Sequence, residues 1–397
     1  MSSTGCSNKL ANRQEPESLS FFFSSPRHTL MAEKMYACLS GKSAFNSLPA
    51  QISLLHDIAH KAGQHNPVVV GAIPFDSRNP VYLGVPEKVL RSDSCRPGGI
   101  VVESPVNLAA PKVRLVPEPE VYKNCVREAL SRFAKGELDK VVLSRTLEVE
   151  AESPVNIRQV LWNLASHNKT GYTFGIDVPC QKENSNVALL GASPELLVSR
   201  KGQKVIANPL AGSAARSKDP VEDQRRAEAL LKSAKDLHEH AVVVDAVASA
   251  LSSFCTDFKV PEQPSLIKTE TMWHLSTVVE GTLKEPETSS LQLATALHPT
   301  PAVCGYPTHK ARQFITENEP FDRGFFTGMV GWCDARGDGE WVVTIRCAEI
   351  KDAFVRLYAG AGVVAASDPD SELAETGAKF RTMLNAIGLD KNAGAVQ

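Results

Sequence analysis

The sequence predicts a layered α+β domain in which helices flank largely antiparallel β-sheets. Two patterns predict this class. Apolar β-runs recur mostly as hairpins instead of forming a regular βαβ series, and amphipathic helical stretches stand between them. The composition supports a sizeable buried core, because 43% of the 397 residues are hydrophobic and 22% are charged.

The first part of the chain is expected to complete this same domain. Residues 1–20 are polar and are predicted to form a flexible leader. Residues 32–63 are mostly helix formers, and the apolar run at 68–73 predicts a strand. The proline-rich stretch at 76–119 is predicted to be irregular chain on the surface. Short apolar runs recur without a clean boundary, so residues 21–119 are assigned to the same domain.

The middle of the chain, 120–389, carries most of the regular elements. Helical periodicity predicts helices at 120–135, 157–166 and 224–254. Strand patterns are expected at 140–145 and in a hairpin of 187–200 and 204–210 around a Lys201-Gly202 turn. The first helix is predicted to bury the face that contains Val121, Cys125, Ala129 and Phe133.

The C-terminal part continues the alternation. Residues 340–350 and 353–358 have the pattern of β-strands, and the glycine-rich segment 359–362 predicts a turn. A last helix is expected to begin near Pro369, because proline suits the first helical position. Residues 390–397 are assigned to a C-terminal tail.

Charge and cysteine usage limit the classes of partner. The formal net charge is −2, so no general field favours nucleic acid. The apolar runs are too short to span a bilayer. Nine scattered cysteines without a CxxC pair indicate free thiols in a reducing compartment. We therefore expect a cytoplasmic protein with a small-molecule partner, no membrane contact and no nucleic acid.

Two residues are candidates for proton transfer. Lys140 precedes three apolar residues, and desolvation there would make a lysine a usable base. The alternative is a strand-start lysine whose ammonium group reaches solvent. Glu195 follows Ser193-Pro194 and precedes an apolar strand, where a carboxyl with a raised pKa would serve as a general acid. Its alternative is a turn cap in solvent.

Carboxylates on two helices form a candidate metal site. Glu372, Glu375 and Lys379 share one helix face by their spacing, and Glu239 from another helix would add an oxygen ligand. Mg²⁺ prefers such ligands. Surface salt bridges are the alternative, including an i,i+4 pair between Lys235 and Glu239.

Several small or basic residues are candidates for binding an anion. Arg346 alternates with Thr344 and Ala348 on one sheet face, which leaves room for a bidentate carboxylate contact. Gly360 and Gly362 belong to a GxGxxA pattern that lacks the following helix of a dinucleotide site, and their backbone is expected to approach an anionic ligand. The Gly212-Ser213 amides could serve the same purpose.

These segments together resemble the chorismate-utilising family, which includes isochorismate, salicylate, anthranilate and aminodeoxychorismate synthases. The resemblance runs from about 120 to 389. It is carried, in order, by the motifs Lys140-Val-Val-Leu-Ser-Arg, Gly191-Ala-Ser-Pro-Glu-Leu-Leu, Pro209-Leu-Ala-Gly-Ser, His238-Glu-His, Trp273-His-Leu, His298-Pro-Thr-Pro-Ala, Phe321-Asp-Arg, Gly331-Trp-Cys-Asp, Thr344-Ile-Arg, Ala359-Gly-Ala-Gly and Glu372-x-x-Glu-Thr-Gly-x-Lys.

The resemblance implies a role for each residue. Lys140 matches the lysine that activates the water attacking C2 of chorismate, and Glu195 the acid that protonates the departing C4 hydroxyl. Mg²⁺ ligands are matched by Glu239 and Glu375, with Glu372 as an outer or water-bridged partner. The positions implied to contact substrate are Gly212, Ser213, Glu239, Ala302, Arg346, Gly360 and Lys379.

Within the family the chain resembles siderophore-pathway isochorismate synthases of the enterobactin type. Lys140 indicates water as the nucleophile, Ala211 stands where aminodeoxychorismate synthases carry lysine, and Phe326 stands where salicylate synthases usually carry tyrosine. Thr327 and Val303 depart from the more usual glycine and leucine. Menaquinone-pathway isochorismate synthases and salicylate synthases are the alternatives.

The resemblance also implies the architecture. The family fold, that of anthranilate synthase component I, is a single large domain with two mainly antiparallel sheets flanked by helices. A monomer is expected, with a weak homodimer as the alternative. A dinucleotide-binding oxidoreductase and a non-catalytic chorismate-binding protein are the rival functions.

Overall fold

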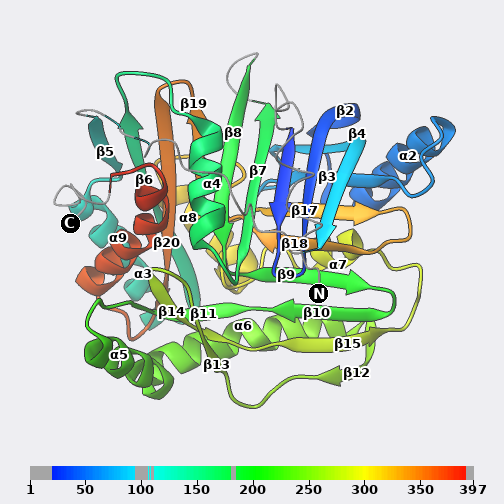
Figure 1. Cartoon of the computed structure of the whole chain (residues 1–397). Coiled ribbons are helices and arrows are strands. Elements are labelled where there is room, and N and C mark those ends of the chain that lie inside the picture. Colours follow the sequence, from blue (N-terminus) through cyan, green and yellow to red (C-terminus); the bar gives the residue numbers. More distant parts are fainter. Residues whose placement is uncertain (1–19, 94–105, 107, 109–110, 180–184, 390–397) are drawn as a thin grey trace, which may run out of the picture.

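The computed structural model describes residues 20–93, 106, 108, 111–179 and 185–389 (Figure 1). Over these residues, seventeen strands form one large antiparallel sheet, three strands form a small sheet, and helices pack on the outside. The predicted α+β class is confirmed. The predicted leader, apart from Ser20, and the predicted tail at 390–397 lie outside the described residues.

The large sheet is a continuous series of antiparallel ladders that folds back on itself. Its first half runs through β5 (Lys112–Val116), β6 (Lys140–Glu150), β20 (Phe354–Val364), β19 (Cys347–Lys351), β8 (Asn186–Ser193), β7 (Tyr172–Pro179) and β1 (Phe21–Ser24). Its second half runs through β2 (His28–Lys42), β4 (Pro80–Asp93), β3 (Val68–Ile73), β17 (Met329–Asp334), β18 (Gly339–Val343), β9 (Leu196–Lys201), β10 (Lys204–Asn208), β15 (Val279–Leu283) and β12 (Cys255–Lys259).

Two further pieces of β-structure complete the fold, the seventeenth strand of the large sheet and the small sheet. The short strand β16 (Gly305–Tyr306) pairs with the start of β6. The small sheet consists of β11 (Leu210–Ala215), β14 (Met272–Ser276) and β13 (Ser265–Lys268).

The core consists of layers on both sides of the two sheet halves. Between the halves, residues such as Phe174, Val330 and Trp332 form an inner apolar cluster. Outside the first half lie α4 (Ile157–His167) and α9 (Pro369–Ala386). Outside the second half lie η1 (Phe45–Ser47), α2 (Leu48–Lys61), α6 (Ala234–Ser252) and α7 (Ser290–Leu297). The strand β6 is covered by α3 (Pro119–Ala134) and α8 (Thr308–Asn318). The alternation of inner and outer side chains along each strand builds this order of helix, sheet, sheet and helix.

The helices predicted at 120–135 and 157–166 are confirmed, as is the last helix from Pro369. The turn at Lys201-Gly202 is confirmed too, but the strand predicted at 187–200 is two strands, β8 and β9, separated by Pro194-Glu195. The buried face of α3 is shifted by one residue from the prediction. It contains Tyr122, Val126 and Ala129, whereas Val121 is 49% exposed. Tyr122, Val126 and Ala129 belong to the apolar cluster with residues of β6, while Cys125 and Phe133 are only partly buried against that cluster.

The prediction was wrong for residues 32–42 and for much of the described part of 76–119, whereas the helix expected later in 32–63 is present as α2. Residues up to Lys42 continue the strand β2, which pairs along most of its length with β4, and the helix begins only at Leu48. The described part of the proline-rich stretch contains the long strand β4 and the strand β5. Strand pairing outweighs the helix propensity of single residues.

Three predicted elements in the second half of the chain also differ. The helix predicted at 224–254 is two helices, α5 (Pro220–Lys232) and α6, because Ser233 leaves the helical conformation and caps α6 with its side chain. The run at 340–350 is interrupted between β18 and β19, where Arg346 has a φ of 51°. The segment 359–362 is the middle of β20 and not a turn.

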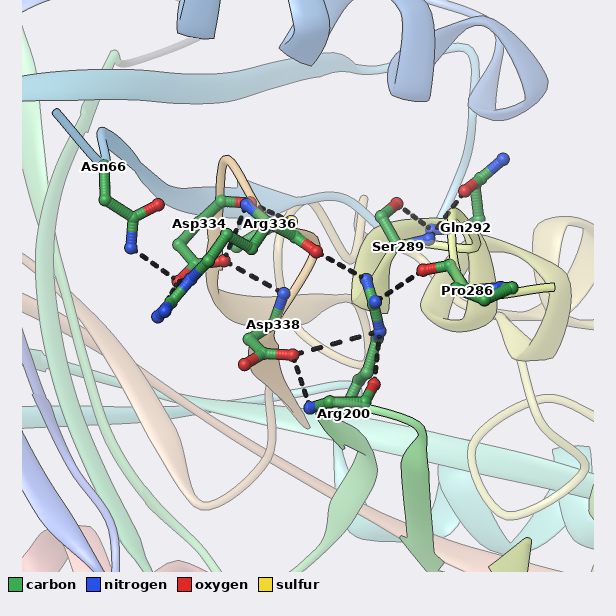
Figure 2. Close-up of polar contacts among 10 residues, drawn as sticks. Asn66, Arg200, Pro286, Ser289, Gln292, Asp334, Arg336 and Asp338 are labelled. Atoms are coloured by element: carbon green, nitrogen blue, oxygen red, sulfur yellow. Dashed lines mark hydrogen bonds and ion pairs between the residues drawn. The ribbon is translucent and has the colours of Figure 1, made fainter. Parts of the chain in front are cut away.

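A polar network holds the C-terminal end of β9 in place (Figure 2). Arg200 is buried and donates to the carbonyl oxygens of Arg336 at 2.9 Å and Pro286 at 2.6 Å. Asp334 accepts hydrogen bonds from Asn66 and from the backbone of Asp338, which orders the turn between β17 and β18. These contacts join the turn to the start of α7 and hold the second half of the large sheet together.

Of the helices in the described part of the chain, none has the length and apolar character required to cross a membrane.

Candidate active site

An open cavity of about 610 Å³ lies where the small sheet, α6, α9 and the middle of β20 meet. It brings together nine of the residues predicted from the sequence: Glu195, Gly212, Ser213, Glu239, Ala302, Arg346, Gly360, Glu375 and Lys379. The other two do not line the cavity. Lys140 pairs with the lining residue Glu239, and Glu372 pairs with Lys235 on the same helix as Glu239. The residues are far apart in the sequence, so the fold itself assembles the site.

Glu195 and Arg346 enter the cavity at interruptions in neighbouring strands. Glu195 stands at the break between β8 and β9, and Arg346 at the break between β18 and β19. These strands pair with each other, and Ala192 N donates to Arg346 O at 3.0 Å, so the two breaks are adjacent. A break lets a side chain leave the alternating pattern of the sheet, which places both groups on the cavity.

Burial gives Glu195 the properties of an acid. The side chain is buried, and desolvation raises its pKa to about 7, although Leu210, Lys140 and Arg346 act in the opposite direction. A substantial fraction of this carboxyl is therefore protonated at neutral pH. The alternative of a solvent-exposed turn cap is wrong.

Lys140 begins β6 and is completely buried, with 0% exposure. Its Nζ lies 2.9 Å from Oε1 of Glu239, which lines the cavity, whereas Lys140 does not. The alternative of a lysine that reaches solvent is wrong. On β20, opposite β6, a side chain at Gly362 would overlap Glu239 Oε1 and approach Lys140 Cε. The glycine is therefore required by the Lys140–Glu239 pair, and the GxGxxA segment is strand rather than a turn.

Arg346 is held by a neutral histidine. Its Nη2 lies 3.3 Å from Nε2 of His274, on β14 of the small sheet. Burial, then Arg346 and Lys379, lower the pKa of His274 well below its ordinary value, so this ring nitrogen accepts the hydrogen bond. Burial also lowers the pKa of Arg346 to about 10, which leaves it charged at neutral pH. The guanidinium is thus a fixed positive group on the cavity wall.

The helix α9 adds a second cation and a carboxylate. Lys379 Nζ lies 2.6 Å from Glu375 Oε1 and donates to Gly360 O at 2.8 Å. Ser213 Oγ donates to the same Glu375 oxygen at 2.9 Å. Ser213 reaches it because Gly212, with a φ of 75°, forms a bulge in β11. Burial raises the pKa of Glu375, but Lys379 and Lys235 outweigh it, so the net pKa is lowered.

Glu372 lies outside the cavity lining and pairs with Lys235 at 2.8 Å. The predicted alternative, a pair between Lys235 and Glu239, is wrong, because Glu239 faces Lys140 instead. Burial and Glu375 raise the pKa of Glu372 to about 7. One buried oxygen of Glu372 has no hydrogen-bond partner among the described residues.

The carboxylates nevertheless fit a hard cation. Glu239 and Glu375 offer oxygens to the same cavity, and the unpartnered Glu372 oxygen stands on the adjacent turn of α9. Each of the three is paired with a lysine here, and within the described ranges no three His, Cys, Asp or Glu side chains form a ready cage for an ion. A cation would have to exchange places with lysine ammonium groups.

Sequence reasoning missed several apolar and aromatic wall residues. Tyr358 lines the cavity with its ring stacked on Phe326, 4.9 Å between centroids and 14° between planes, and its hydroxyl donates to Glu349 at 2.9 Å. His274 belonged to a recognised motif but had no assigned role. Strand alternation predicts the sheet face on which Tyr358 and His274 each lie. It does not predict which face borders the cavity, so it could not identify them as wall residues.

Comparisons with known proteins identify the family of the chain. Residues 103–388 match the family described as chorismate binding enzyme, and the chain belongs to that family. It is 55% identical, over 374 residues, to the isochorismate synthase DhbC of Bacillus subtilis, covering 93% of this chain and 94% of the relative.

Two solved structures are similar as well. The crystal structure of a putative 2,3-dihydroxybenzoate-specific isochorismate synthase, DhbC from Bacillus anthracis, matches with a TM-score of 0.89 and 52% identity over 97% of this chain and 100% of that one. Anthranilate synthase component I from Streptococcus pneumoniae matches with a TM-score of 0.71 and 21% identity over 94% of each chain, which shows the shared fold.

Proposed function

We propose that this protein is a Mg²⁺-dependent isochorismate synthase that converts chorismate into isochorismate. The observation that carries the proposal is one cavity in which a buried, readily protonated Glu195 stands among Arg346, Lys379 and the Lys140–Glu239 pair. The extensive identity to isochorismate synthases supports it. Chorismate carries two carboxylates, and the cationic groups suit them.

The reaction requires two proton transfers. Lys140 takes a proton from water as its oxygen attacks C2 of chorismate, the ring double bonds shift, and the C4–O bond breaks. Glu195 gives its proton to the departing C4 hydroxyl, which leaves as water, so one water is added and one is lost. Lys140 is an ammonium ion in its pair with Glu239, so it must first release one proton to that carboxylate and turn to the water before it can act as the base.

The remaining residues bind and orient the substrate. Arg346, fixed by His274, and Lys379, fixed by Gly360, would hold carboxylates, while Gly212, Ser213 and Ala302 would contact the substrate. Glu239 and Glu375 would hold Mg²⁺, with Glu372 in an outer position, and the ion when bound would offset the negative charge of the ring carboxylate.

The proposed setting is the synthesis of a 2,3-dihydroxybenzoate siderophore. The name of the Bacillus anthracis structure supports this setting. The alternative is menaquinone synthesis, which the sequence resemblance leaves open; a putative isochorismate synthase MenF of Mycobacterium tuberculosis is 44% identical over 334 residues. We further propose a monomer that works in the cytoplasm on free chorismate.

The direct test is to incubate the protein with chorismate and Mg²⁺ and to separate the products by chromatography. We expect isochorismate as the main product, with little salicylate above the decay seen without enzyme. Forming salicylate requires the C2 hydrogen to reach the enolpyruvyl methylene while the C3–O bond breaks and pyruvate leaves. Phe326 offers no hydroxyl to hold that pose. Unchanged chorismate, or enzyme-dependent salicylate as the main product, would contradict the proposal.

A further inference from the structure

The Phe321-Asp-Arg323 motif has no role in the chemistry described so far. Arg323 is only 3% exposed and lies between α8 and β17. It does not line the cavity, but it lies directly behind residues that do. A buried guanidinium is costly unless its donors are satisfied, so its contacts identify what it stabilises.

All five N–H donors of Arg323 are used. Its Nε and Nη2 donate to the two carboxylate oxygens of Glu319, at 2.7 and 2.5 Å. Nη2 also donates to the carbonyl oxygen of Val142 at 2.8 Å. Nη1 donates to the carbonyl oxygen of Val303 at 2.8 Å and to Oγ1 of Thr327 at 3.3 Å. Glu319 in turn accepts from the backbone N–H of Ser144 at 2.8 Å, so the ion pair is itself tied to β6.

Three of these partners belong to different walls of the cavity. Val142 lies two residues after Lys140 on β6, Val303 follows Ala302, and Thr327 follows Phe326. We propose that Arg323 is a positioning residue that fixes these three walls relative to one another and thereby sets the pose of the substrate. This inference rests on the proposed function and names the group that enforces its product specificity.

Thr327 connects the guanidinium to the wall beside the substrate. It is 1% exposed and has a φ of 58°, a conformation that a β-branched residue rarely adopts. Its hydroxyl donates to the carbonyl oxygen of Phe326 at 2.6 Å and accepts from Arg323. Such a conformation persists where the surroundings over-determine it. The hydroxyl therefore holds the backbone that orients Phe326, whose ring stacks on Tyr358.

The test compares four variants by their KM and kcat for chorismate and by their ratio of salicylate to isochorismate. Thr327→Val removes the hydroxyl but keeps the branched shape, and Thr327→Ser keeps the hydroxyl. Arg323→Lys keeps the charge but loses the fork of donors. Arg200→Lys is the matched control, because Arg200 is also buried and bound to carbonyl oxygens but lies about 16 Å further along β9 from Glu195. Each is assayed at a temperature where circular dichroism shows it folded.

We expect Thr327→Val and Arg323→Lys each to raise KM and the share of salicylate by about tenfold. Each variant loses hydrogen bonds of the Arg323–Thr327 contact, so the cavity wall at Phe326 that orients the enolpyruvyl group becomes less rigid. Thr327→Ser and Arg200→Lys should keep the wild-type ratio, even where Arg200→Lys lowers the melting temperature. The inference is overturned if Thr327→Val or Arg323→Lys loses stability as Arg200→Lys does while KM and product ratio stay at wild-type values. Wild-type protein that makes no isochorismate would instead refute the proposed function.

Discussion

Replacing Lys140 by alanine or Glu195 by glutamine is expected to lower kcat by at least ~10², the usual contribution of a general acid or base. Both side chains are buried beside one cavity, and the reaction needs one group to remove a proton and another to supply one. Steady-state turnover of chorismate measures the loss. Lys204→Ala is the control, because that lysine is exposed on β10 and should leave turnover unchanged. Near wild-type turnover in either variant would refute the assignment.

Stability measurements separate lost chemistry from lost folding. Burial raises the pKa of Glu195 from 4.5 to about 7. Between these values the unfolded chain releases the proton that the folded chain keeps, so this carboxyl lowers the stability of the fold as the pH rises. Glutamine does not titrate. Glu195→Gln should therefore be more stable than the wild type at pH 8, by about 3 kcal/mol, and gain nothing from this effect at pH 4.

Lys140→Ala should have the opposite effect on stability. It leaves the buried carboxylate of Glu239 without its ammonium partner, which costs about 3–5 kcal/mol. Its turnover is therefore measured where circular dichroism shows native structure.

Chelation of divalent metal is expected to abolish activity completely. Glu239 and Glu375 are paired with lysines, so the ion must compete with those lysines and should be held weakly without substrate. Excess EDTA should stop turnover, and Mg²⁺ added beyond the chelator should restore it. EDTA already saturated with Mg²⁺ serves as the control. Full turnover in excess EDTA, or a tightly bound zinc ion found by elemental analysis, is incompatible with the proposed site.

The residues of the candidate site were selected through the resemblance to the chorismate-utilising family, because its motifs are local and can be matched in the sequence, whereas spacing alone left each residue open to a plainer interpretation. The spacing of Glu375 and Lys379 on one helix predicts their contact, and the structure has it. The partner of Glu239 could not be predicted in this way. Lys235 lies at the correct spacing on the same helix but binds Glu372 of α9, because packing of the two helices decides the pairing.

The fold class was predictable, whereas element boundaries depended on long-range pairing. The strand β2 contains many helix formers, but its ladder with β4 keeps it extended. The glycines at 360 and 362 have the composition of a turn, yet they lie within β20 because that strand pairs with β6. They are glycines because side chains from β6 and α6 occupy the space that a Cβ would need. Neither effect is visible in a local window of sequence.

The most direct test of the central claim, that water activated by Lys140 attacks C2 while Glu195 expels the C4 hydroxyl, is an isotope measurement. The enzyme is incubated with unlabelled chorismate in ¹⁸O-water, and isochorismate from the first turnovers is analysed by mass spectrometry. The proposed chemistry predicts one ¹⁸O atom per isochorismate, in the C2 hydroxyl. Isochorismate that retains only the unlabelled oxygen would show that the hydroxyl migrates within the molecule, and would contradict the assigned roles of both residues.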